Sequence, residues 1–224
     1  MDQFATQILG QLWSSLWWVL LLFIGLIVFK LFKPFLKGKL GEFAVATHVK
    51  LYLKDPEYRL LNDLTLPDGE GSTTQIDHLL LSPYGLFVIE TKNYKGWIFG
   101  GERQKTWTQK LYKNSYKFQN PIHQNYKHIK VLEQLLADII EPDQLHSVIV
   151  FMPDAEFKTP MPNYVFRGAG WTDYVKSFNQ RVISDTKIKR IQIRLEKEVL
   201  EKSWKTNREH VANLNRRESE QKSL

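Results

Sequence analysis

Cysteine is absent from all 224 residues of the chain. Without a thiol the protein can form no disulfide framework, no thiolate zinc site and no cysteine nucleophile. None of the six histidines stands in an H-E-x-x-H pattern, so the usual histidine spacing of a zinc protease is missing as well. The sequence also contains no internal repeat and no low-complexity tract.

The residues that are present have the composition of a folded protein with a basic surplus. Hydrophobic residues make up 43% and charged residues 25% of the chain, which predicts a genuine core and excludes a disordered or fibrous protein. The 31 Lys and Arg against 24 Asp and Glu give a net charge of +7 and a pI near 9.4. This balance favours a polyanionic partner, either nucleic acid or anionic lipid headgroups.

Residues 12–29 form an uncharged apolar run, LWSSLWWVLLLFIGLIVF. As a helix this run would span about 27 Å, close to the hydrocarbon thickness of a bilayer. A buried core helix is one alternative, but core helices are seldom apolar on every face. A cleaved signal peptide is another, but no Lys or Arg precedes the run. We therefore expect a retained transmembrane helix that contacts the lipid bilayer through residues 12–29.

Lysines gather at one end of this run, and they predict its orientation. Lys30, Lys33, Lys37 and Lys39 follow the run within ten residues. By the positive-inside rule, that end faces the cytoplasm. The sequence thus predicts a single-pass protein of the cell membrane with the bulk of its chain in the cytoplasm.

Hydrophobic periodicity after the linker predicts alternating helices and strands. One helix is expected over residues 40–53, where apolar residues at positions 40, 43, 44, 47 (in part) and 51 follow helical spacing. Three more helices are expected: from Pro121 to about residue 140, from Thr172, and from Asp185 to about residue 205. Strands are expected over residues 58–66, 73–81, 86–92, 97–100, 105–109 and 146–152. This order predicts an α/β domain with a mixed sheet.

The expected hairpin around Ser82-Pro83-Tyr84-Gly85 carries the polar residues of interest. If Ser82 pairs with Gly85, the register places Asp77 opposite Glu90 and Gln75 opposite Lys92, on one face of the two strands. Opposed carboxylates repel each other, and more strongly in a drier site, so a proton, a cation or the Lys92 ammonium must offset the repulsion. A divalent hard cation held by carboxylate oxygens does so naturally. An exposed hairpin face screened by water is the alternative.

Four segments of the sequence together resemble a known family. They are GKLGE at 38–42, QIDH at 75–78, GLFVIETK at 85–92 and NPIHQ at 120–124. In this order and spacing they are similar to the nuclease-related domain, NERD, of the PD-(D/E)XK nuclease superfamily. The resemblance implies a restriction-endonuclease-like core, a mixed sheet flanked by helices, with a metal site at the hairpin. Ile76 stands where the superfamily motif has proline before its aspartate.

The resemblance also implies roles for single residues. Asp77 matches the metal-binding aspartate, Glu90 the second acidic ligand and Lys92 the motif lysine. Glu42 matches the acidic residue of the first core helix, and Gln124 the polar position on the helix after the sheet. Gln124 could instead cap strand ends. His128, one helical turn further on, could reach the same site or be an ordinary surface or partly buried residue.

Phosphodiester hydrolysis gives these residues a mechanism. Mg²⁺ or Mn²⁺ bound to Asp77, Glu90 and the backbone carbonyl of Thr91 would lower the pKa of a bound water and bind a phosphate oxygen. Lys92 would position the attacking water or stabilise the transition state, and it can be a base only if its pKa is lowered. Glu42 would add a water-mediated or second-sphere contact.

Basic and aromatic residues alternate after the hairpin. This composition suits nucleic acid, through phosphate contacts and base stacking, although a solvated face with inward aromatics explains it nearly as well. Contact with anionic lipid is a further alternative. The candidate nucleic-acid-binding residues are Lys105, Lys110, Lys113, Lys117 and Lys127.

The sequence therefore predicts four parts. Residues 1–37 are a transmembrane anchor with a basic linker, 38–152 the nuclease-related domain, 153–206 a helical extension that closes the domain, and 207–224 a polar, disordered tail. The predicted function is a membrane-anchored, metal-dependent nuclease acting on DNA or RNA, with DNA favoured. The alternative is a membrane-tethered module with a nuclease-like fold that binds nucleic acid, or acts as a scaffold, without cutting.

Overall fold

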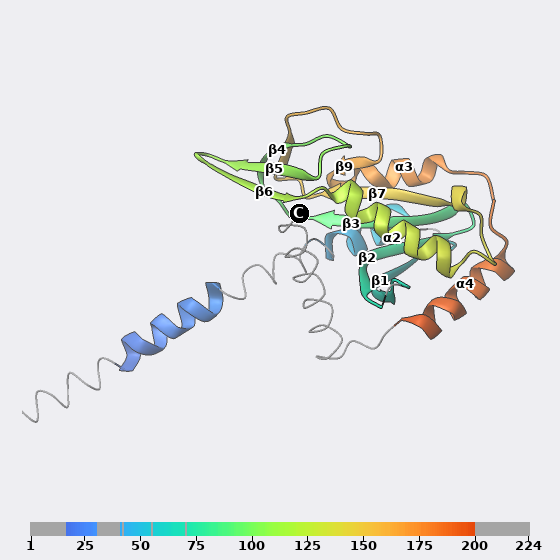
Figure 1. The fold of residues 1–224 in the computed structure, drawn as a ribbon, viewed down its shortest axis with the longest axis horizontal. Helices are drawn as coiled ribbons and strands as arrows, with labels where there is room; N and C mark the ends of the chain where they lie inside the picture. The colour runs from blue at the N-terminus through green and yellow to red at the C-terminus, as the bar shows by residue number, and fades with distance from the viewer. Residues whose placement is uncertain (1–16, 31–40, 42, 55, 70, 200–224) are drawn as a thin grey trace, which may run out of the picture. The chain divides into compact units, whose positions relative to one another are not determined.

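A computed structural model describes residues 17–30, 41, 43–54, 56–69 and 71–199 (Figure 1). The chain divides into two compact units, residues 1–40 and residues 41–224. In the first unit, residues 17–30 are helical. No helix among the described residues is long and apolar enough to cross a membrane. Residues 12–16 of the expected span, most of the basic linker and the expected tail 207–224 lie outside the described residues.

A five-stranded mixed sheet with strand order β1-β2-β3-β7-β9 forms the centre of the second unit. β1, β2 and β3 are antiparallel neighbours, whereas β7 and β9 continue the sheet in parallel. The strands span Arg59–Pro67 (β1), Thr73–Ser82 (β2), Gly85–Lys92 (β3), Leu145–Phe151 (β7) and Val165–Arg167 (β9). β3 is central and is covered on both faces, which explains why its first six residues are all buried.

Helices cover both faces of this sheet. α2 (Pro121–Leu135) and α4 (Asp185–Glu198) pack on one face through a core that includes Leu79, Leu132 and Ile191. The helical residues 43–52 and α3 (Trp171–Ser177) pack on the other face. Short 3-10 turns over Pro142–Gln144 and Gly168–Gly170 precede β7 and α3.

The helix over residues 43–52 buries a different stripe from the expected one. Val45, Val49 and Leu53 face the core, whereas Phe43 and Leu51 are exposed. The expectation that positions 43 and 51 face the core was therefore wrong. Val45, Val49 and Leu53 are also spaced four apart, so helical periodicity alone allowed either stripe.

A second mixed sheet, with order β6-β5-β4-β8, follows the first. Its strands span Gly96–Phe99 (β4), Thr106–Leu111 (β5), Asn114–Gln119 (β6) and Ala155–Phe157 (β8). Trp107 stacks on Phe151 of β7, with ring centroids 6.0 Å apart and planes 9° apart, and this contact joins the two sheets. A Cβ at position 100 would lie 2.2 Å from the Trp107 ring, so this close approach requires Gly100.

The fold is thus a mixed α/β arrangement of two mixed sheets flanked by helices. The expected strands and the expected hairpin are present, but the single expected sheet is two sheets. Residues beyond 152 contribute β8 and β9 to these sheets in addition to α3 and α4.

Candidate active site

The β2–β3 hairpin has the register that its turn predicted, as far as His78. Ser82 pairs with Gly85, and the ladder runs to His78 opposite Ile89. Asp77 lies one residue beyond this last pair. The β1–β2 ladder also skips Asp77, opposite which Asp63 adopts a positive φ of 56°. Asp77 therefore stands where β2 departs from regular pairing on both sides, as at an irregularity that re-aims a side chain.

The packing of neighbouring residues confirms this local distortion of β2. Ile76, Leu79 and Leu81 all contribute to the core under α2, whereas strict alternation would send Ile76 to the opposite face. The Gln75 side-chain amide donates a hydrogen bond of 3.5 Å to Oδ1 of Asp63 on β1, so this bond runs to β1 and not toward Lys92.

Thr91 holds the Asp77 carboxylate at the end of β3. Oδ2 of Asp77 accepts hydrogen bonds from the backbone N–H and from the hydroxyl of Thr91, each 2.9 Å long. Burial, followed by the nearby charge of Glu90, raises the pKa of Asp77 to about 6 from its ordinary 3.8, although the Thr91 N–H and Lys92 oppose the rise. Asp77 is therefore an acid that binds its proton more tightly than usual, chiefly because it is buried and also because a second carboxylate is close.

Glu90 and Lys92 form a buried ion pair on the same strand. Nζ of Lys92 lies 2.6 Å from Oε1 of Glu90 and 2.9 Å from Oε1 of Gln124 on α2. Burial alone would raise the pKa of Glu90, but the charge of Lys92 and the contact with His128 outweigh it and lower the pKa. Burial alone would lower the pKa of Lys92, but Glu90 and Asp77 raise it. Glu90 is thus held as a carboxylate and Lys92 as an ammonium.

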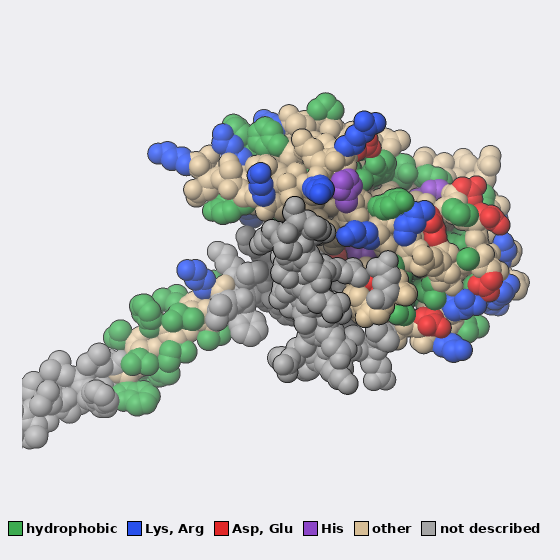
Figure 2. Space-filling view, in the orientation of Figure 1, with side chains coloured by type: hydrophobic (Ala, Val, Ile, Leu, Met, Phe, Trp, Pro, Cys, Tyr) green, Lys and Arg blue, Asp and Glu red, His purple; other side chains and the backbone are tan. Residues whose placement is uncertain are grey.

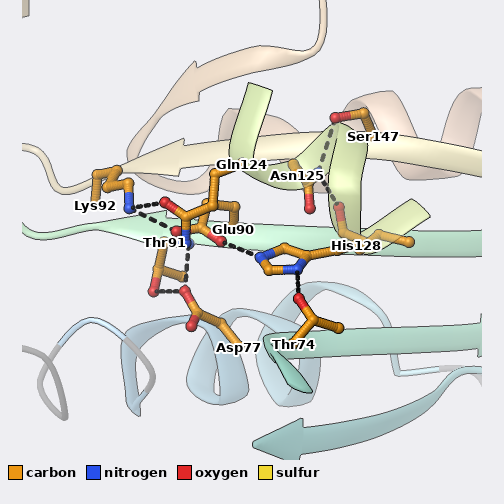
Figure 3. A network of polar contacts seen from close by, with 10 residues as sticks. Thr74, Asp77, Glu90, Thr91, Lys92, Gln124, Asn125, His128 and Ser147 are labelled. Carbon is orange, nitrogen blue, oxygen red and sulfur yellow. Dashed lines mark hydrogen bonds and ion pairs between the residues drawn. The ribbon is translucent and has the colours of Figure 1, made fainter. Parts of the chain in front are cut away.

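His128 approaches Glu90 from the next turn of α2 (Figure 3). Its Nε2 lies 3.3 Å from Oε2 of Glu90, and its Nδ1 lies 2.7 Å from the hydroxyl of Thr74. Nε2 and Oε2 are both buried, and neither has a partner in hydrogen-bond geometry among the residues that the structure describes. Glu90 therefore has one oxygen bound to Lys92 and a second buried oxygen whose hydrogen-bonding capacity is unused.

Asn125 fastens α2 to the strands that carry the site. Its side-chain amide donates to the carbonyl of Val88 on β3 and to the hydroxyl of Ser147 on β7, both at 2.8 Å. Asn120 caps the start of α2 by accepting from the N–H of Ile122. These contacts determine where Gln124 and His128 lie relative to Lys92 and Glu90.

The structure brings together five of the residues that the sequence singled out. Asp77, Glu90, Thr91, Lys92 and Gln124 lie within one network of contacts (Figure 3). The Thr91 contacts run through its N–H and its hydroxyl. Glu42 lies outside the described residues, so its predicted role stays a prediction.

Sequence reasoning missed three members of this network: Thr74, Asn125 and Ser147. It considered His128 without assigning it to the site. A signal was available, because Pro121, Asn125, His128 and Leu132 are the buried residues of α2 and follow one helical stripe. Polar residues on such a stripe must find buried partners.

The five candidate nucleic-acid-binding lysines do not belong to this network. Lys110 and Lys117 lie on β5 and β6, and Lys113 lies in the turn between these strands. Lys105 immediately precedes β5, and Lys127 is an exposed residue of α2. These five lysines therefore lie on or beside the second sheet and on the outer face of α2.

Comparison with protein families identifies the chain. The family model of the nuclease-related domain matches residues 37–152, which is more than half of the chain. The protein belongs to the NERD family. The match begins near the predicted domain start, covers both strands of the hairpin, and ends just after β7.

A curated relative carries no assigned activity. An uncharacterized protein of Bacillus anthracis is 48% identical over 104 residues, which are 46% of this chain and 48% of that protein. The chain thus spans about half the length of the curated relative that it matches. A comparison with solved structures found no match.

Proposed function

We propose that this NERD protein is a membrane-anchored, metal-dependent nuclease that hydrolyses phosphodiester bonds of DNA or RNA, with DNA the better candidate. The observation that carries the proposal is that Thr91 holds Asp77 within the influence of the buried Glu90–Lys92 ion pair, to which Gln124 is bonded. An acid before the hairpin turn and an acid-x-lysine after it are what a PD-(D/E)XK site of restriction-endonuclease-like architecture needs.

The donor set suits a hard divalent cation. Asp77 and Glu90 supply carboxylate oxygens, and no described residue forms a hydrogen bond with the buried Oε2 of Glu90. The described residues contain no group of three or more Asp, Glu, His or Cys that could hold a metal. Mg²⁺ is commonly bound by only one or two carboxylates, with water and substrate phosphate completing its shell, so two acids fit Mg²⁺ or Mn²⁺ better than Zn²⁺. In the proposed site the backbone carbonyl of Thr91 would be a third oxygen ligand.

The chain's own residues then divide the work. A bound Mg²⁺ would lower the pKa of a coordinated water and neutralise phosphate charge. Because the pKa of Lys92 is raised, Lys92 is protonated at neutral pH and serves as a charged donor to a phosphate oxygen or to the attacking water. It is not the general base. Gln124 orients the Lys92 ammonium, and Thr91 keeps Asp77 aimed at the site. Glu42 is proposed to add a water-mediated contact.

Nucleic acid is the proposed substrate because exposed lysines lie on the second sheet and on the outer face of α2. We assign phosphate contacts to Lys105, Lys110, Lys113, Lys117 and Lys127. Contacts of this type are independent of base sequence and weaken with salt.

The membrane anchor is part of the proposal on the strength of residues 12–29. The helix over residues 17–30 leaves its large apolar side chains from Trp17 to Phe29 exposed to between 45% and 75%. A bilayer would cover such an apolar surface, and Lys30 with the lysines that follow would place the nuclease domain in the cytoplasm.

A second function, binding without cleavage, is favoured by one observation. Lys92 and Glu90 satisfy each other directly, so the ion pair is complete without a substrate or a cation. A nuclease-like module that only binds nucleic acid, or serves as a scaffold, would need no more than this.

A cleavage assay separates the two functions. The full chain in detergent is incubated with Mg²⁺ or Mn²⁺ and plasmid, linear duplex or single-stranded substrates, beside its Asp77→Asn and Lys92→Met variants. We expect cleavage that chelation of the metal stops and that both substitutions abolish. Salt-sensitive binding without cleavage under any of these conditions would support the binding module instead.

A further inference from the structure

The tip of the β5–β6 hairpin carries an aromatic residue that folding does not explain. Tyr112 and Lys113 form a two-residue turn between Leu111 and Asn114, which pair across the hairpin. Tyr112 has a φ of 51° and a side chain that is 99% exposed. Glycine or asparagine suits such a backbone, and a tyrosine there costs about 1 kcal/mol or more. Its ring offsets none of this cost by packing.

The charge around this tip has one sign. From position 103 to position 132 the sequence contains seven Lys or Arg and no Asp or Glu. Within the described part of the chain, Lys110, Lys113 and Lys117 form no ion pair with an acidic side chain. In Figure 2 the projecting hairpin shows Lys or Arg side chains and no Asp or Glu on the face in view.

The strand register places a second exposed ring, Trp97, on the face of the sheet that carries two of these lysines. Lys110 pairs with Trp97 of β4 on one side and with Ser115 of β6 on the other, and Lys117 pairs with Thr108. Trp97, Lys110 and Lys117 therefore share one face of the sheet. Trp97 is 44% exposed, and the ammonium groups of Lys110 and Lys158 lie 5.7 Å and 4.8 Å from its ring centroid.

This hairpin is connected to the candidate active site. β4 begins four residues after Lys92. Tyr94 lies between Lys92 and β4, and its ring centroid is 4.3 Å from that of Phe118 on β6. Figure 1 shows β5 and β6 extending past the first sheet at the end where β3 finishes. A polymer held along the hairpin would thus lead toward Glu90 and Lys92.

We propose that the β5–β6 hairpin is an arm that holds single-stranded nucleic acid, with Tyr112 stacked on an unpaired base. Lys110, Lys113 and Lys117 contact the flanking phosphates, and Trp97 offers a second stacking surface. Aromatic rings interleaved with lysines bind single strands without base preference, because every base has a π face and every nucleotide a phosphate. A duplex offers phosphates but no accessible base faces. The inference rests on the proposed function, since its ligand is the substrate of the nuclease, and it adds a preference for unpaired strands.

Binding without cleavage tests this arm. The full chain in detergent is titrated into a fluorescent 20-nucleotide single strand, or into the matching duplex, with EDTA present, and anisotropy gives the affinity. We expect Tyr112→Gly to weaken single-strand binding about tenfold, the order of one lost stacking contact, and Tyr112→Phe to retain it. Duplex affinity should change much less. Tyr52→Ala, which removes an exposed ring from another surface, is the control and should bind as the unaltered chain does.

Thermal unfolding of the same variants excludes a folding defect. Glycine relieves the backbone at φ 51°, so Tyr112→Gly should melt at the same or a higher temperature than the unaltered chain while binding less well. If Tyr112→Gly binds the single strand with the same affinity as the unaltered chain, the proposal is overturned. The proposal is also overturned if Tyr112→Gly loses binding to anionic phospholipid vesicles but keeps its binding to the single strand, since the arm would then be a lipid contact.

The arm and the nuclease can fail separately. If the unaltered chain binds single strands through Tyr112 but cuts nothing with Mg²⁺ or Mn²⁺, the arm stands and catalysis does not. If it cuts with metal while Tyr112→Gly binds and cuts as before, catalysis stands and the arm does not.

Discussion

Two acids and one lysine, all largely buried, form the centre of the candidate site at the scale of single residues. Glu90 is 1% exposed, and its charge is balanced by Lys92 at 2.6 Å. Among the described residues no cation contacts Asp77 directly, and its carboxylate accepts two hydrogen bonds from Thr91. The proposed metal would supply the positive charge that Asp77 lacks.

Breaking the buried pair should cost stability, and removing both partners should restore it. Lys92→Met leaves the Glu90 carboxylate buried without its cation, which we expect to lower the free energy of unfolding by about 3–5 kcal/mol. The double variant Glu90→Gln/Lys92→Met removes both charges of the pair and should recover most of that loss, yet remain inactive. Chemical denaturation and cleavage assays on the same samples measure the two effects. A double variant no more stable than the sum of its single changes would contradict this account of the pair.

The raised pKa of Asp77 predicts a stability effect that depends on pH. The pKa is about 6 in the folded protein against an ordinary 3.8, so the folded state binds this proton more tightly. The resulting stabilisation is complete below about pH 4 and is lost as the pH rises through 6, a difference of about 3 kcal/mol. In metal-free protein, Asp77→Asn should therefore melt higher than the unaltered chain at pH 8 and close to it at pH 4. An equal gain at both pH values would show that ionisation of Asp77 is not the cause.

At the scale of elements, α2 is the part that assembles the site. It carries Gln124 and His128 to a hairpin that already holds both acids. Asn125 sets its position through two hydrogen bonds to β3 and β7.

Removing this anchor should loosen α2 and the site together. Asn125→Ala leaves the Val88 carbonyl and the Ser147 hydroxyl without these partners, and we expect a loss of about 2–3 kcal/mol in unfolding free energy and weaker cleavage. Gln134→Ala, at an exposed position of the same helix, is the control and should change neither. If Asn125→Ala lowers stability while cleavage is unaffected, α2 is structural only.

Much of this element order could be predicted because it follows from local patterns. The Ser82–Gly85 turn predicted the register of the hairpin, and buried Ile188, Ile191 and Leu195 confirm the helical spacing of α4. β6 was not predicted, because NSYKFQ is almost wholly exposed and its alternation is limited to Tyr116 and Phe118 on either side of Lys117. The three-residue strands β8 and β9 are likewise too short to give a periodic signal.

The residues of the candidate site could largely be predicted from the sequence, whereas their geometry could be predicted only in part. The hairpin register indicated that Asp77 and Glu90 approach each other, but the irregularity at Asp77 depends on Asp63 of a third strand, with its positive φ. Thr74 and Ser147 contribute through contacts with α2, and nothing in their own strands indicates such partners. Contacts that form only through tertiary packing cannot be predicted from local sequence patterns.

At the scale of the whole molecule, the proposed anchor would confine the nuclease to a membrane surface. We expect the full chain to remain with the membrane fraction after washing with high salt and alkaline carbonate, because apolar insertion resists both. Substituting Leu22 and Ile24 with lysine should release the protein, since each buried charge opposes insertion by about 2.5–3.5 kcal/mol. Release of the unaltered chain by salt alone would indicate electrostatic association and no inserted helix.

The most direct test of the central claim is calorimetric titration of Mn²⁺ and Mg²⁺ into the full chain in detergent. The account predicts saturable binding, with about one ion per chain in the absence of substrate, that is lost in Asp77→Asn and in Glu90→Gln and retained in Gln134→Ala. No heat of binding from the folded, unaltered chain, or equal binding by Asp77→Asn, would contradict the claim that these two acids hold a divalent cation.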